Sequence, residues 1–195
     1  GLYCTLAYFK YFNIKEVYNF GKNGSKFGGH PDRKKIPGVE ISAGSLGHGI
    51  GIAVGIALAS KIKKEKRKVI VLIGDGEANE GTVWESVLVA VNLNLNNLTI
   101  IYDNNKSQKR CLQIKNPKKH FSGFGCDVIE ENGHNIDEIK YGLRKKTKNV
   151  KVIIANTIKG KGSISIEKNI YEWHRRSPNK EELTKFLNEL NAKTI

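Results

Sequence analysis

The sequence predicts an α/β fold in which an open, mostly parallel β-sheet carries helices on both faces. Two short apolar runs rich in β-branched residues, 69–73 and 98–102, are bounded by turn residues, as is typical of strands buried on both faces of a parallel sheet. The segment between them has helical periodicity, with apolar residues at Trp84, Val87, Leu88, Val91 and Leu95. A strand, a helix and a second strand in this order form the crossover unit from which parallel sheets are built.

The remaining elements follow from the same patterns. Helices are expected over 2–12, 49–64 and 116–125, from Asn135 onwards and at the stripe Leu183, Phe186, Leu187 and Leu190, with a short helix or turn over 14–20 and further strands over 126–130 and 150–157. The pairs Thr82 with Glu85 and Asn135 with Glu138 have the spacing of capping boxes, which mark helix N-termini. The alternation of strands and helices supports the α/β assignment.

Polar loops follow both strands of the crossover. Gly-Asp-Gly stands at 74–76 and Asp-Asn-Asn at 103–105. In open parallel sheets ligands bind at the carboxyl ends of the strands, so both loops are expected to face one crevice. The glycines allow a ligand to approach the backbone closely, and a carboxylate with an amide oxygen suits Mg²⁺, which completes its coordination with water and substrate phosphates. These residues predict a magnesium diphosphate site.

Longer segments define a family resemblance. Gly-Asp-Gly followed by Asn105 about thirty residues later resembles the thiamine diphosphate-binding motif. The further segments are Gly-His-Pro (29–31), Pro-Gly-Val-Glu-Ile-Ser-Ala-Gly-Ser-Leu-Gly-His-Gly (37–49), Gly-Asp-Gly-Glu-Ala-Asn-Glu-Gly-Thr-Val-Trp-Glu (74–85), Thr-Ile-Lys-Gly-Lys-Gly (157–162) and Glu-Trp-His (172–174). Together, and in this order, they resemble the N-terminal section of a transketolase, from just before His30 to about Pro178.

The resemblance implies that thiamine diphosphate is held through a divalent cation, Mg²⁺ or alternatively Ca²⁺ or Mn²⁺. The metal ligands would be Asp75, the amide oxygen of Asn105 and the backbone carbonyl of Ser107, a position where the family more often has leucine. The remaining cofactor contacts would come from Gly44, Ser45 and Leu46 at the ring system and from Gly76, Asn105, Lys159 and His174 at the diphosphate.

The same resemblance implies two catalytic residues. His30 corresponds to a histidine that hydrogen-bonds the sugar near the reacting carbonyl, a role that needs both a donor and an acceptor. Glu80 corresponds to a glutamate in a carboxylate network across the active-site interface, whereas Glu77 is expected to be structural.

One departure from the family follows Trp-His, where transketolases typically continue with glycine and this chain has Arg175 and Arg176. Three interpretations stay open at this point. The arginines contact a substrate phosphate, they contact a partner chain, or they displace His174 from its usual place.

The resemblance covers only the part of a transketolase that holds the diphosphate, since the family's pyrimidine-binding domain is separate. We therefore expect a transferase, the N-terminal subunit of a split transketolase that passes a two-carbon ketol unit from a sugar or sugar phosphate donor to an aldose. Its partner would be a C-terminal subunit, in a heterotetramer or another dimer-based oligomer. We expect residues 1–195 to form one domain that lacks its native N-terminal segment, because the sequence contains no methionine.

Composition narrows the classes of function that remain possible for the protein. The formal charge of +14 suits nucleic acid, an anionic surface or phosphorylated substrates, but no aromatic residues interleave the basic ones, which favours a solvated surface. Three cysteines without metal-binding spacing indicate a reducing, cytoplasmic location, and the longest apolar stretch, 50–59, is shorter than the ~20 residues of a membrane span. The alternatives are another thiamine diphosphate enzyme, such as 1-deoxyxylulose-5-phosphate synthase or one chain of a 2-oxoacid dehydrogenase, and a basic nucleic-acid-binding module.

Overall fold

The structure, a computed structural model, describes residues 1–192 of the chain. Contacts between residues divide the chain into two compact units, Gly1–His48 and a second unit that begins at Gly49. Within the described residues no helix is long and apolar enough to cross a membrane.

The first unit is a small aromatic cluster with long loops. It contains α1 (Leu2–Tyr8) and the 3-10 helix η1 (Ile14–Asn19), and its hydrophobic cluster is formed by the buried residues Leu6, Phe27, Ile36 and Val39. The helix predicted over 2–12 is therefore shorter than expected. It ends because Lys10 adopts the left-handed conformation, with φ 63°.

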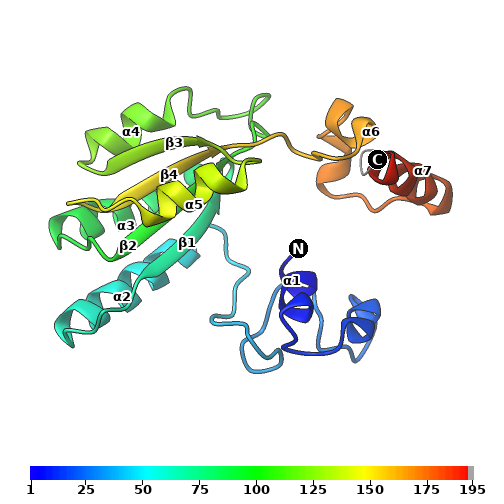
Figure 1. Cartoon of the computed structure of the whole chain (residues 1–195), viewed down its shortest axis with the longest axis horizontal. Coiled ribbons are helices and arrows are strands. Elements are labelled where there is room, and N and C mark those ends of the chain that lie inside the picture. Colours follow the sequence, from blue (N-terminus) through cyan, green and yellow to red (C-terminus); the bar gives the residue numbers. More distant parts are fainter. Residues whose placement is uncertain (193–195) are drawn as a thin grey trace. The chain divides into compact units, whose positions relative to one another are not determined.

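The second unit is built on a sheet of four parallel strands, β1 (Val69–Gly74), β2 (Leu98–Asn104), β3 (Asp127–Asn132) and β4 (Lys151–Asn156). Their order is β1-β2-β4-β3 (Figure 1). Alternate residues of the central strand β2, from Leu98 to Tyr102, are fully buried in the main core. The predicted open parallel sheet is confirmed.

Helices cover both faces of this sheet. The core joins one face to α2 (His48–Ile62), α3 (Gly81–Asn92) and α4 (Pro117–Gly123), and α5 (Ile136–Arg144) packs on the opposite face (Figure 1). On that second face Ile70 and Leu72 of β1 remain 55% and 66% exposed. The cover is therefore complete on one face and partial on the other.

Lys151 anchors α5 to the sheet. Its buried ammonium donates to the backbone carbonyls of Gly142 (3.0 Å) and Leu143 (2.9 Å) near the C-terminus of α5. Burial lowers the pKa of Lys151, and the nearby Lys68 lowers it further. A cation at the last turn of a helix is favoured by the helix dipole, which offsets part of this desolvation.

The last elements form a small helical segment of the second unit. They are α6 (Ile164–Lys168), the 3-10 helix η3 (Glu172–His174) and α7 (Lys180–Asn191). The closing helix is confirmed, although only Phe186 of its predicted stripe is buried. No sequence pattern predicted α6 or η3.

One capping prediction is confirmed and another is wrong. Asn135 caps α5, because its side-chain oxygen accepts from the backbone of Asp137 and Glu138. By contrast, α3 begins at Gly81, so Thr82 lies inside the helix and Glu80 occupies the N-cap without a side-chain cap bond. The helix turns Val83, Val87 and Ala90 into the core and leaves Leu88 50% exposed.

Candidate functional site

The loops that follow β1 and β2 leave the sheet at the same edge. The two strands are adjacent, and Gly74 is paired with Asp103 in their register. Residues after Gly74 and after Asp103 are therefore neighbours, as the parallel arrangement predicts.

Asp75 is the central carboxylate of this edge. It is only 6% exposed, and its oxygens accept hydrogen bonds from the Gly76 backbone (2.8 Å), the Ser107 hydroxyl (2.6 Å) and the Gln108 backbone (3.1 Å). A buried carboxylate with three donors is held in one orientation. Asp75 therefore joins the loop after β1 to the loop after β2.

Asn105 is oriented by two further hydrogen bonds. Its amide nitrogen donates to Asp103 (2.7 Å), and its amide oxygen accepts from the Ser107 backbone (2.9 Å). A carboxylate can only accept, so Asp103 determines which end of the amide is the oxygen. Ser107 contacts both predicted metal ligands, and the structure thus brings Asp75, Asn105 and Ser107 into one cluster.

The chemistry of this donor set fits Mg²⁺. Carboxylate, amide and backbone carbonyl oxygens are hard ligands, and Mg²⁺ normally takes few protein ligands and completes its shell with water and phosphate oxygens. Residues 1–192 contain no cluster of three or more His, Cys, Asp or Glu side chains able to hold a metal. A cation at this edge would therefore depend on the oxygens of Asp75, Asn105 and Ser107.

A cavity of about 560 Å³ opens beside Asn105. Its polar wall combines the ends of β2 and β4 with the loop after β4, and its apolar wall comes from the sheet and α5. The lining includes Asp103, Asn105, Thr157, Lys159 and Gly160. Lys159 thus shares one cavity with a predicted metal ligand, as an anion-binding lysine should.

Lys159 contacts the second predicted diphosphate residue, His174. The Lys159 ammonium lies 2.5 Å from Nδ1 of His174. Because an ammonium can only donate, Nδ1 accepts and the ring carries its proton on Nε2. This pair leaves the Nε2 proton of His174 as a donor for an anion.

Burial and the nearby carboxylates change the pKa of a tyrosine at the end of β2. Tyr102 is fully enclosed at the end of β2, and burial together with the charges of Asp75 and Asp103 raises its pKa to about 12. Tyr102 therefore remains neutral and packs edge-on against Phe121.

Three residues of this edge were missed by sequence reasoning. Asp103 accepts from the Thr157 hydroxyl, which ties β2 to the loop after β4. His134 accepts from the Ile158 backbone through Nε2 (2.8 Å) and so supports the residue before Lys159. The one available signal was that Thr157 opens the Thr-Ile-Lys-Gly-Lys-Gly segment.

Gly76 has a steric requirement. A Cβ added there would lie 2.6 Å from Nε2 of Gln108. The absence of a side chain thus lets the second loop lie against the first.

In the first unit, the predicted ring-binding and sugar-binding loops touch each other. A Cβ on Gly44 would lie 3.1 Å from Cγ of His30, and the Ala43 backbone donates to the Pro31 carbonyl (3.2 Å). His30, Gly44, Ser45 and Leu46 are all exposed. Exposure leaves these residues available for a ligand.

The two glutamates after Asp75 differ. Glu77 accepts from the Gly74 backbone (3.3 Å), which agrees with the structural role predicted for it. Glu80 is exposed at the N-cap of α3, so its side chain is free to act outside the helix.

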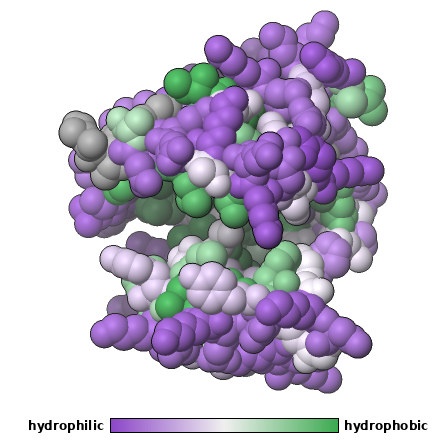
Figure 2. Space-filling model, turned by 90° about the vertical axis from the view of Figure 1, so that its right-hand side faces the viewer, coloured by the Kyte–Doolittle hydropathy of each residue, from purple (hydrophilic) through white to green (hydrophobic). Residues whose placement is uncertain are grey.

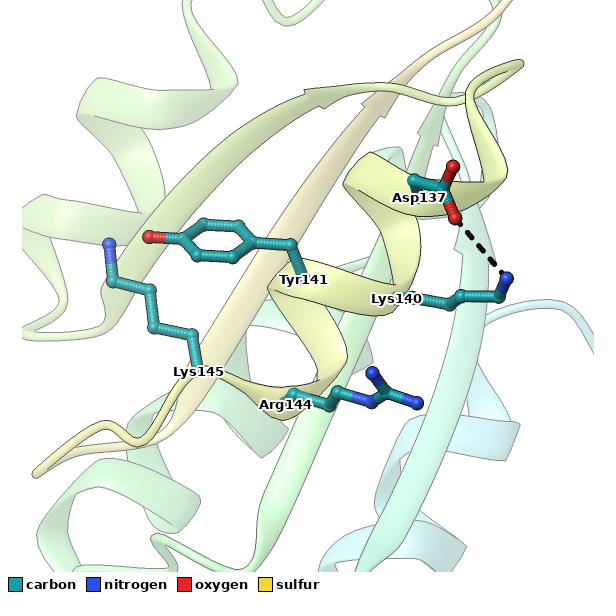
Figure 3. Close-up of a pocket in the computed structure, with 5 residues that line it drawn as sticks. All are labelled: Asp137, Lys140, Tyr141, Arg144 and Lys145. Atoms are coloured by element: carbon teal, nitrogen blue, oxygen red, sulfur yellow. Dashed lines mark hydrogen bonds and ion pairs between the residues drawn. The ribbon is translucent and has the colours of Figure 1, made fainter.

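A second depression, of about 470 Å³, lies on the outer side of α5 and does not belong to this site (Figure 3). All its lining residues come from that helix and its C-cap: Asp137, Lys140, Tyr141, Arg144 and Lys145. Asp137 pairs with Lys140 at 3.2 Å, and the Lys145 ammonium lies 5.7 Å from the ring centroid of Tyr141 (Figure 3). Hydrophilic residues make up most of the face drawn in Figure 2.

Comparison with known proteins agrees with this geometry. The family described as "Transketolase, thiamine diphosphate binding domain" matches residues 2–190. The chain therefore belongs to the transketolase family and is a thiamine diphosphate-binding domain of it. The predicted family, the binding of thiamine diphosphate and the transferase class are confirmed.

Within the family, the chain is similar to subunits of split enzymes. It is 41% identical, over 97% of its length and 71% of the relative, to one of the subunits of the apulose-4-phosphate transketolase of Actinobacillus succinogenes. It is 34% identical, over 84% of its length and 62% of the relative, to a 6-deoxy-6-sulfo-D-fructose transketolase subunit of a Clostridium species. The predicted subunit of a split transketolase is confirmed.

Solved structures give the same assignment. The transketolase of Campylobacter jejuni superposes with a TM-score of 0.82 at 31% identity, over 91% of this chain. The chain spans only 30% of that transketolase.

Proposed function

We propose that the loops after β1 and β2 hold thiamine diphosphate through Mg²⁺, with the Asp75 carboxylate, the Asn105 amide oxygen and the Ser107 carbonyl as protein ligands. Ca²⁺ or Mn²⁺ could serve in its place, because the oxygen donors are the same. The observation that carries this proposal is the position of Ser107, which hydrogen-bonds Asp75 through its hydroxyl and Asn105 through its backbone. One residue thereby holds both ligands at neighbouring strand ends.

The diphosphate would be bound by Gly76, Lys159 and His174. Gly76 leaves room for close approach, Lys159 supplies a positive charge, and His174 supplies the Nε2 proton left by its contact with Lys159. Gly44, Ser45 and Leu46 would line the ring system, the small residues allowing backbone contact and Leu46 adding apolar surface.

The reaction would be transfer of a two-carbon ketol unit from a ketose to an aldose. When bound, thiamine diphosphate supplies the electron sink for carbon–carbon bond cleavage. His30 would orient the sugar by hydrogen bonding near its reacting carbonyl, and Glu80 would join a carboxylate network at the interface with a partner chain.

We propose that the partner carries the pyrimidine-binding domain and that the active assembly is a heterotetramer or another dimer-based oligomer. The two relatives are named for substrates that carry a phosphate or a sulfo group. The formal charge of +14 supports a substrate with such an anionic group.

Calorimetric titration tests the cofactor site. We expect thiamine diphosphate to bind with Mg²⁺ present and to be lost when the cation is chelated. Binding that ignores chelation would contradict the metal-mediated site.

Reconstitution tests the partner. The chain should show no ketol transfer alone and should gain it when it is co-purified with a pyrimidine-domain subunit. Turnover by the isolated chain would contradict the need for a second subunit.

A further inference from the structure

The four residues Tyr171–His174 are held by two arginines from different parts of the second unit. The guanidinium carbon of Arg110 lies 4.1 Å from the ring centroid of Tyr171, and that of Arg176 lies 4.0 Å from the ring centroid of Trp173. Both distances are within the range of cation–π contacts. The segment that ends in His174 therefore has a basic group on each of its aromatic residues.

Arg176 is held in place by two carboxylates. It donates two hydrogen bonds to Glu182 (2.8 Å each) and one to Glu172 (2.5 Å), and the Glu182 pair is bidentate. The Arg176 hydrogen bond is the main cause that lowers the pKa of Glu182 to about 2. Since Glu182 lies in α7 and Glu172 in η3, Arg176 joins the two helices.

Trp173 completes this connection. Besides Arg176, it contacts Phe186 edge-on, with ring centroids 4.8 Å apart and planes at 90°. Phe186 is the buried residue of α7. Trp173 thus contacts α7 directly through Phe186 and is linked to it a second time through Arg176, which pairs with Glu182 of that helix.

Arg110 connects the same segment to the metal-binding edge. It lies in the loop after β2, three residues beyond Ser107, whose hydroxyl donates to Asp75. The contact of Arg110 with Tyr171 therefore links this loop to the residues that precede His174. Among the described residues, no other cation–π contact joins the loop after β2 to the Tyr171–His174 segment.

These contacts give the second arginine a role within the chain. Three of the five N–H groups of Arg176 donate to carboxylates and its face lies on Trp173, so most of its binding capacity is used by residues of this chain. His174 is not displaced from Lys159, which it contacts at 2.5 Å. Arg176 therefore acts within this chain.

We propose that Arg110 and Arg176 are positioning residues that hold the Tyr171–His174 segment so that His174 presents its Nε2 proton to a diphosphate oxygen. This inference rests on the proposed function, because it assigns His174 to the diphosphate. It adds two residues that bind neither the metal nor the substrate.

The test compares Arg176→Gln and Arg110→Gln with Arg175→Gln in the full chain. Arg175 is the matched control, since it is an exposed arginine next to the same histidine. His174→Gln sets the effect of losing the histidine itself. Each variant is titrated with Mg²⁺ and thiamine diphosphate, and the ring nitrogens of His174 are followed by ¹⁵N NMR.

We expect Arg176→Gln and Arg110→Gln to weaken cofactor binding about tenfold, the scale of one charge-assisted hydrogen bond, and Arg175→Gln to leave it unchanged. In the NMR spectrum the wild type should show a protonated Nε2 and an unprotonated Nδ1, and both positioning variants should average the two nitrogens. Arg110→Gln leaves the Arg176 carboxylate pairs intact, so it reports even where Arg176→Gln unfolds α7.

Two results would overturn the proposal. If His174→Gln weakens binding while both positioning variants behave like Arg175→Gln, the arginines have no positioning role and the proposed function stands. If the wild type binds no cofactor, or His174→Gln has no effect, the assignment of His174 fails and this inference fails with it.

Discussion

Replacing Asp75 with asparagine separates the charge of this side chain from its shape. The variant keeps the side-chain volume and one oxygen, which can still accept from Gly76 and Ser107. Its new NH₂ group would face the backbone N–H of Gln108, whose nitrogen lies 3.1 Å from the Asp75 carboxylate in the wild type. Two donors then oppose each other in a site that is 6% exposed.

The cost without cofactor follows from this one lost contact. A hydrogen bond to a charged group contributes about 1.5–3 kcal/mol, and a shift in Tm of about 2–4 °C accompanies each kcal/mol in a chain of this size. We expect Asp75→Asn to lower Tm by about 3–12 °C in the absence of ligand.

The cofactor gives the larger and more specific effect. A ligand at 100 times its Kd stabilises the wild type by about 2.7 kcal/mol. Loss of a direct metal ligand should weaken binding by at least the ~100-fold reached by outer-shell changes, which leaves about 0.4 kcal/mol at the same concentration. Thermal shift with and without Mg²⁺ and thiamine diphosphate measures both the loss of Tm without ligand and the rise in Tm on adding the cofactor.

Asp127→Asn is the matched control. Asp127 also accepts three hydrogen bonds, from Lys148 and Asn149, but at the amino end of β3. This variant should lose stability and keep the full shift on adding cofactor. If Asp75→Asn keeps that shift as well, the magnesium site is not where we place it.

Three further outcomes can be measured. Asp103→Asn releases the amide of Asn105 and should weaken Mg²⁺ affinity about 10–100-fold in a titration at fixed thiamine diphosphate, whereas unchanged affinity would remove Asp103 from the site. Gly76→Ala forces Gln108 aside and should weaken cofactor binding with little change in Tm, because the clash is with the end of a flexible side chain; a large loss of Tm would contradict this. Hydrogen bonds from two serine hydroxyls lower the pKa of Glu189 from 4.5 to about 2. The folded pKa lies below the unfolded one, so the stabilisation is present above about pH 4.5 and is lost as pH falls towards 2; Glu189→Gln should flatten this part of the pH–Tm curve, and an unchanged curve would refute the role of Glu189.

The strands could be predicted because each depends on a local pattern. The β-branched runs at 69–73 and 98–102 are continuous. Successive side chains of a strand point to opposite faces of the sheet, so a strand with helices on both faces is apolar at every position. The position of the proposed metal site followed from the same reasoning. In a parallel sheet Asp75 and Asn105, which each follow a strand, must emerge at one edge.

The errors occurred where competing contacts decide the outcome. Thr82 with Glu85 has capping-box spacing, but packing of Val83, Val87 and Ala90 on the sheet starts α3 at Gly81. The arginines after Trp-His were ambiguous for a related reason. Arg176 pairs with Glu182 of α7, and the sequence spacing of the two residues does not predict that their side chains meet.

The sequence by itself determined the fold class and the family, because these depend on residue type and on the order of strands and helices along the chain, and it supplied the side chains that we propose as metal ligands. Only the tertiary structure decided that Ser107 joins Asp75 to Asn105, that Asp103 orients the amide, and that Lys159 lies against His174. The physical reason is that hydrogen bonds act only within about 3.5 Å. Whether residues that are distant in the chain approach so closely depends on strand register and loop path, which local patterns leave open.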